Sequence, residues 1–260
     1  MALFGDPGGR APSAGDEDEY SLFHRRSESM GWLDTRGVIE WRDGFEEHVG
    51  TRGLWALHDA GTGSVTEGVA GPPADYWFHV GVEPLPVGGA LPTQALLRCI
   101  GDVVAMRQSE FRLRAVQFVL PTQLLDVGRR RDMALAPSVE GMGWLAMSEV
   151  LAQSDPVPAK IEISLPAEMP RNFARNMAES VHELAAPLLR EALVTEVDSV
   201  EVPVLVADHF WDGPSRGAVS IRCEFQGWTF EGVGWLAGFV ADFCARNGFS
   251  GNAVVTASAT

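Results

Sequence analysis

The sequence has few cysteines, a single lysine and no long apolar run. Cys99, Cys223 and Cys244 lie far apart and in none of the spacings typical of zinc sites or redox pairs. We therefore expect free thiols in a reducing, cytoplasmic compartment. The first twenty residues lack the basic and apolar regions of a signal peptide, and no stretch is apolar for long enough to span a bilayer. Any chemistry that needs a lysine depends on Lys160.

Basic residues are also scarce relative to acidic ones. The sequence contains 20 Lys and Arg against 35 Asp and Glu, which gives a formal net charge of −15. An acidic surface repels the phosphates of nucleic acids and of anionic lipids, so we expect neither as a partner. With 260 residues, 46% of them hydrophobic, the chain can bury a core without disulfide or metal support.

The first 75 residues differ in composition from the rest. Residues 1–30 combine Gly, Pro and Ser with an acidic run, a composition that predicts a flexible acidic arm. Residues 31–75 predict a β ribbon and a loop, in which 38–41 pairs antiparallel with 54–57. Neither segment is expected to belong to the main body.

Hydrophobic periodicity in the main body predicts alternating strands and helices. We expect strands at 76–82, 113–120, 133–139, 160–165, 200–206, 218–226 and 253–259, and helices at 93–106, from 141, at 173–188 and at 230–246. The hexamer at 141–146, GMGWLA, recurs as GVGWLA at 232–237, which indicates an internal duplication. The order strand, helix, strand, strand, helix, strand is ferredoxin-like. The predicted fold is therefore α+β, with an antiparallel sheet and two ferredoxin-like (βαββαβ) repeats at 76–165 and 166–260.

The hexamer at 141–146 formally matches the dinucleotide fingerprint G-x-G-x-x-G/A. Pro137 in the preceding stretch argues against a central parallel strand, and Glu162 lies inside a strand instead of at its carboxyl end. The second copy has Asn252 where an acid would be needed. We interpret both hexamers as packing motifs and expect no cofactor.

Two His/Asp pairs, His58-Asp59 and Asp208-His209, are compatible with a metal site. No other ligand stands at the helical i, i+4 spacing that such sites use, so we expect no metal.

Alternation along the strands places many polar residues on one face of the predicted sheet. This face would carry Trp77, His79, Glu83, Glu162, Arg222 and Glu224. One interpretation is a solvated face with paired charges, the usual arrangement in antiparallel sheets. The other is a ligand cleft lined by titratable and aromatic side chains.

The cleft interpretation predicts a cofactor-independent enzyme of small-molecule metabolism, such as a cyclase, isomerase or lyase acting on an aromatic or apolar substrate. The candidate proton-transfer residues are His79, Glu162, Glu224 and His209. The candidate substrate-binding residues are Trp77, Glu83, Arg222 and Trp211. The alternative is a non-catalytic interaction protein, such as an immunity factor or chaperone, that binds its partner through an acidic surface. A homodimer is compatible with either.

Overall fold

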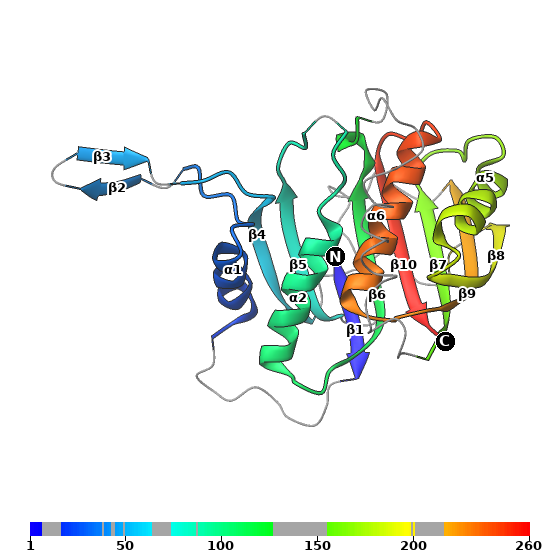
Figure 1. Cartoon of the computed structure of the whole chain (residues 1–260), viewed down its shortest axis with the longest axis horizontal. Coiled ribbons are helices and arrows are strands. Elements are labelled where there is room, and N and C mark those ends of the chain that lie inside the picture. The colour runs from blue at the N-terminus through cyan, green and yellow to red at the C-terminus, as the bar shows by residue number, and fades with distance from the viewer. Residues whose placement is uncertain are drawn as a thin grey trace.

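Eight antiparallel strands form the main sheet, in the order β4-β5-β1-β6-β10-β7-β9-β8, and four α-helices accompany them in the described part of the chain (Figure 1). The structure is a computed structural model that describes residues 1–6, 17–37, 39–42, 45–48, 50–63, 74–86, 88–126, 155–198, 200 and 216–260. The predicted α+β class with an antiparallel sheet is therefore confirmed.

The sheet strands are β1 (Ala2–Asp6), β4 (Trp55–Gly63), β5 (Ala74–Val82), β6 (Arg112–Pro121), β7 (Val157–Leu165), β8 (Leu189–Val197), β9 (Gly217–Phe225) and β10 (Asn252–Ala259). The helices are α1 (Glu19–Ser29), α2 (Thr93–Arg107), α5 (Phe173–Ser180) and α6 (Phe230–Arg246), with a 3-10 turn η1 (Thr122–Leu124) and a π-helical turn η3 (Val181–Ala185). A separate hairpin of β2 (Ile39–Arg42) and β3 (Phe45–His48) projects from the body (Figure 1).

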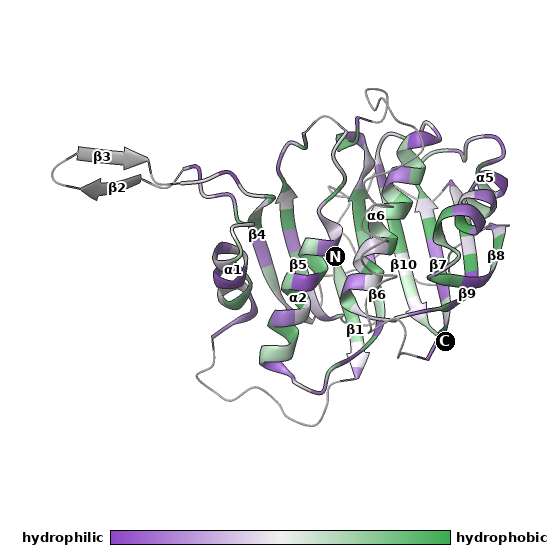
Figure 2. Ribbon diagram, in the orientation of Figure 1, coloured by the Kyte–Doolittle hydropathy of each residue, from purple (hydrophilic) through white to green (hydrophobic). Residues whose placement is uncertain are grey.

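The helices cover the apolar face of the sheet. Alternation along β7 buries Ile161 and Ile163 completely, and their neighbour Val255 on β10 is equally buried. Figure 2 shows β10 predominantly in the hydrophobic colour, while hydrophilic and hydrophobic residues alternate along β9. Helices α2 and α6 pack against each other, and α6 contacts β6 and β10. The opposite face carries the polar residues of the strands.

Helix α6 owes its start and its close contact with α2 to local sequence. The Thr229 side chain caps the helix by accepting a hydrogen bond from the Gly232 amide at 3.1 Å. A Cβ on Gly234 would lie 2.9 Å from the Thr93 carbonyl oxygen on α2, so only glycine permits this helix crossing. Trp235 is 1% exposed. The second hexamer thus has the packing role that we predicted.

The predicted flexible arm is wrong for the described residues of 1–30. Strand β1 lies between β5 and β6 and pairs with both, and Leu3 is fully buried. Asp18 caps α1, whose Phe23 is also fully buried. The average composition of residues 1–30 does not indicate these elements. One short strand and one helical turn of apolar residues are enough to anchor the segment to the core.

The predicted ribbon is wrong in its pairing. Strand β2 pairs with β3, whereas Trp55 begins β4, which joins the edge of the main sheet beside β5. The sequence pattern predicts no strand at the position of β8, because these residues follow the predicted helix at 173–188 and precede the predicted strand at 200–206. The predictions for 133–139, for the helix from 141 and for 201–206 lie outside the described residues.

The described residues include no helix that is long and apolar enough to cross a membrane.

Candidate functional site

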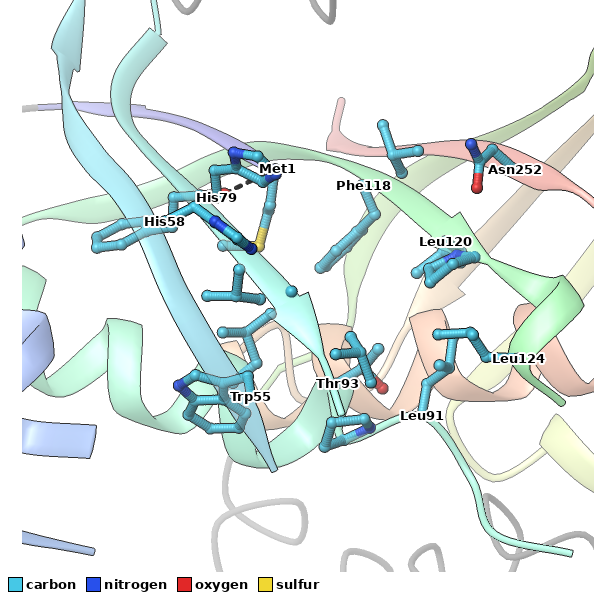
Figure 3. Close-up of a pocket in the computed structure, with 18 of the residues that line it drawn as sticks. Met1, Trp55, His58, His79, Leu91, Thr93, Phe118, Leu120, Leu124 and Asn252 are labelled. Atoms are coloured by element: carbon cyan, nitrogen blue, oxygen red, sulfur yellow. Dashed lines mark hydrogen bonds between the residues drawn. The ribbon is translucent and has the colours of Figure 1, made fainter. Parts of the chain in front are cut away.

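A cavity of about 670 Å³ lies between β5 and β6, next to the start of β1. Both strands pair with β1, in which Ala2 is opposite Trp77 and Gln117, and β5 continues past this level to Val82 and β6 to Pro121. The lining residues come from β4, β5, β6, η1, the first turn of α2 and the ends of β1 and β10: Met1, Trp55, His58, Asp59, Trp77, Phe78, His79, Val80, Gly81, Val82, Leu91, Pro92, Thr93, Leu96, Phe118, Val119, Leu120, Pro121, Leu124 and Asn252. Figure 3 shows residues of β4 and β5 facing Phe118 and Leu120 of β6 across it.

The wall toward the helices is mainly apolar. Phe118 and Leu120 are each 2% exposed, and Leu91 is 6% exposed. Leu124 of η1 lines the cavity as well and is 38% exposed, so one apolar side chain of this wall reaches the surface. This wall suits an apolar ligand surface.

The positive end of the α2 dipole lies at the same wall. Pro92 occupies the N-cap position and makes no side-chain hydrogen bond to the helix. Thr93, in the first turn, lines the cavity and is 6% exposed (Figure 3). Amide groups in an uncapped first turn carry partial positive charge.

The wall away from the helices carries a pair of stacked histidines. The ring centroids of His58 and His79 are 4.9 Å apart, with an interplanar angle of 27°. His58 falls at an irregularity of β4, because Leu57 pairs with Val80 and Asp59 with His79. This irregularity places His58, Asp59 and His79 together on adjacent strands.

Two glycines make room for the aromatic side chains on this wall. A Cβ on Gly81 would lie 2.6 Å from Nε2 of His58, so the imidazole occupies the space above that glycine. A Cβ on Gly61 would lie 3.1 Å from the Trp77 ring, which lies across β4. The Trp77 Nε1–H group is buried and has no hydrogen-bond partner in the described part of the chain. A buried donor of this kind is costly unless a ligand accepts its hydrogen.

Met1 forms the floor between β5 and β6. Its ammonium group donates a hydrogen bond to the Phe78 carbonyl oxygen at 3.0 Å (dashed line in Figure 3). Burial lowers the pKa of this ammonium group to about 6.

Of the predicted site residues, His79 and Trp77 line the cavity. Glu83 follows β5 and forms an ion pair with Arg36, so it is engaged beside the cavity instead of within it. His209 and Trp211 lie outside the described residues. The sequence pattern singles out His58 and Asp59 only as a metal pair, and no group of three or more metal-ligating side chains occurs in the described ranges.

Three predicted site residues lie on the same face of the sheet as His79 but outside the cavity: Glu162, Arg222 and Glu224. One row of directly opposite residues crosses six strands of the sheet, and all its members project to the same side. The row is Trp77, Ala2, Gln117, Thr256, Glu162 and Ser220. The predicted assignment of faces is correct for these strands.

These three residues nevertheless lie far from the cavity. Glu162 is four strand steps from His79, or about 19 Å at about 4.8 Å per step. It is 4% exposed and pairs with Lys160, with 3.1 Å between Oε1 and Nζ. Arg222 and Glu224 lie one strand further away, on β9. The structure therefore does not bring these residues together with His79.

Comparison of the chain with protein-family models, with curated proteins and with solved structures finds no significant match. The chemistry of the cavity is therefore the basis for a functional assignment. It combines an apolar wall with two imidazoles, one carboxylate and one unsatisfied indole donor, groups that together can bind an apolar molecule and move a proton to or from it.

Proposed function

We propose that the chain is a cofactor-independent enzyme that binds a mainly apolar small molecule in the cavity between β5 and β6 and catalyses a proton transfer, as a cyclase, isomerase or lyase does. The observation that supports this most directly is the stacked pair His58 and His79 at the edge of an apolar cavity of about 670 Å³. Cavities of roughly 300–1,000 Å³ with few polar groups are typical of small-molecule sites.

Each polar group on the wall has a distinct role in this proposal. His79 is the proton-transfer residue, since neutral imidazole both accepts and donates protons. His58 stacks on it and holds its ring plane, and Asp59 lies directly opposite His79 in the β4–β5 pair. Trp77 donates its indole hydrogen to an oxygen of the substrate and so orients it.

Ligand binding is tested with an apolar fluorescent dye, 8-anilinonaphthalene-1-sulfonate. We expect Leu96→Trp, which fills the cavity from α2, to weaken dye binding at least tenfold relative to the unchanged chain. Met106→Trp is the matched control, because Met106 is on the same helix but is 60% exposed and away from the cavity. Equal dye binding by both variants would show that the cavity is not the binding site.

Catalysis is tested by incubating the protein with a metabolite extract in deuterium oxide. A proton transfer to carbon adds one deuterium to the product, which mass spectrometry detects. We expect His79→Gln to abolish this labelling and His182→Gln, at an exposed position on η3, to leave it unchanged. Labelling that is the same for both variants would contradict the role of His79.

We also propose that the sheet consists of two ferredoxin-like units. The first would be β1-α1-β4-β5-α2-β6 and the second β7-α5-β8-β9-α6-β10, divided between β6 and β7 instead of at residue 165. Numbered within each unit, the strands stand in the order 2-3-1-4 in the first unit and 4-1-3-2 in the second, which is the same order read from opposite edges. This arrangement supports a duplication with an approximate two-fold axis between β6 and β10.

A constant offset of about 137 residues supports the same axis. Helix α2 starts at Thr93 and α6 at Phe230, and 230 − 93 = 137. In the β6–β10 pair, Phe118 is opposite Val255, and 255 − 118 = 137. The proposed two-fold axis passes between β6 and β10, so it relates these two strands to each other. Limited proteolysis between β6 and β7, followed by co-purification of two fragments of similar size, is the expected result.

A cytoplasmic location remains part of the proposal. The three cysteines are free and buried, as in proteins of reducing compartments. Fractionation of cells that express the tagged chain tests this location directly.

A further inference from the structure

The cavity is bordered by two strand edges that face each other without a strand between them in the described residues. On β5, the Phe78 amide donates to the Met1 carbonyl oxygen at 3.0 Å, and the Phe78 carbonyl accepts from the Met1 ammonium group. Backbone groups in an antiparallel strand point alternately to its two neighbours. The N–H and C=O groups of Val80 and Val82 therefore point the same way as those of Phe78, into the cavity.

Strand β6 also directs backbone groups into the cavity. Because Met1 and Leu3 bond to β5, Ala2 bonds to β6, where it is opposite Gln117. The backbone of Gln117 therefore faces β1, and two residues later the N–H and C=O of Val119 face the cavity, followed by the carbonyl of Pro121. Val80, Val82 and Val119 all line the cavity.

The space between these edges has the width of one strand. Strand β1 occupies it between Tyr76 and Val116, where it pairs with both neighbours, so β5 and β6 are two strand steps apart, or about 9.6 Å. Strand β7 shows what fills such a space in the other half of the sheet. It pairs with β9 and β10 along its length, from Ala159 to Ser164 on both sides.

We propose that the substrate of this cavity is an extended, peptide-like chain of about four residues, which continues the line of β1 and pairs with β5 and β6 as β7 pairs with its neighbours. This inference rests on the proposed function, because it concerns the same cavity. Backbone pairing supplies affinity in such strand additions, and side-chain pockets supply specificity.

The two walls define which side chains fit. Side chains of an inserted strand point alternately to the two faces of the sheet. One set would meet the apolar wall at Leu91 and Leu96, and the other would meet His58, His79 and Trp77. The site therefore selects a chain in which apolar residues alternate with residues that carry a hydrogen-bond acceptor for the Trp77 indole.

The test uses an acetylated and amidated pentapeptide of alternating valine and serine, and a twin that is N-methylated at its central amide. Binding is followed by tryptophan fluorescence, because Trp55 and Trp77 line the cavity. Hydrogen exchange reports on the amides of Val80, Val82 and Val119. We expect fast exchange at these three amides in the free protein, slower exchange with the peptide, and about tenfold weaker binding of the methylated twin, because it lacks one donor.

Val119→Pro is the matching change on the protein. It removes one amide that faces the cavity, while the amides of Phe118 and Leu120 still face β10. We expect weaker peptide binding than in the Val119→Thr variant, which keeps the backbone amide at the same position. If the proline variant does not fold, the methylated twin decides the question alone.

The outcomes separate this inference from the proposed function. Dye binding in the cavity with no protection of the three amides by the peptide, or with equal affinity for both peptides, would overturn the peptide-like substrate and leave the proposed function standing. Loss of dye binding to the cavity as well would overturn both.

Discussion

Leu3 provides a direct test of the position of β1 in the structure. Its side chain is fully buried between the central strands and the helices, in a segment whose composition predicts a flexible arm. We expect Leu3→Ala to lower the free energy of unfolding, because the substitution removes buried methyl groups and leaves a cavity that the surrounding core only partly fills.

The size of the effect follows from complete burial. Replacement of a buried leucine by alanine costs about 2–5 kcal/mol. For a chain of this size each kcal/mol corresponds to about 2–4 °C in the midpoint of thermal unfolding, so we expect a decrease of about 4–20 °C. The backbone pairing of β1 is retained in this variant, so the change measures the side chain alone.

The assay is urea denaturation followed by tryptophan fluorescence, with thermal unfolding as a second measurement. Met106→Ala is the control, because Met106 is 60% exposed and its substitution should change the free energy of unfolding by less than about 0.5 kcal/mol. If Leu3→Ala were as mild as Met106→Ala, β1 would not be part of the core, and the cavity defined by its end would lose its basis.

Three further predictions concern helix packing, capping and pH. Gly234→Ala should lower the free energy of unfolding by about 1–2 kcal/mol, because its Cβ would meet the Thr93 backbone at 2.9 Å. Gly101→Ala should cost less in the same urea titration, because its Cβ would meet side-chain atoms of Phe230 at 3.0–3.3 Å and no backbone atom. Thr229→Ala should cost about 1 kcal/mol through loss of the α6 cap, and Thr229→Ser should restore most of it. Burial raises the pKa of the Cys244 thiol from 9.0 to about 12, so its contribution to stability is complete below pH 9 and is lost as pH rises from 9 toward 12. The urea midpoint should therefore fall over this range, and fall less in Cys244→Ala; an identical decline in both would contradict the assignment.

Local sequence was a sound guide wherever one element determines its own structure. The alternation along β7 and β9 predicts which residues face the core, and the register across the sheet confirms that Glu162 and Arg222 share a face with His79. The glycines of the second hexamer predict close packing, which Gly234 makes against α2. These features depend on periodicity and on the size of a side chain, both of which are present in the sequence itself.

The candidate site depends on contacts between distant parts of the chain. His58 and His79 were each visible in the sequence, but their stacking depends on an irregular pairing of β4 with β5, which no local pattern encodes. The cavity exists because β1 lies between β5 and β6, more than 70 residues away in the chain, and pairs with only part of each. The sequence by itself determined the class of the fold, the faces of its strands and the acidic balance of its charges. Only the tertiary structure decided which strands are neighbours, because the free energy of pairing distant strands depends on the whole core that they bury together.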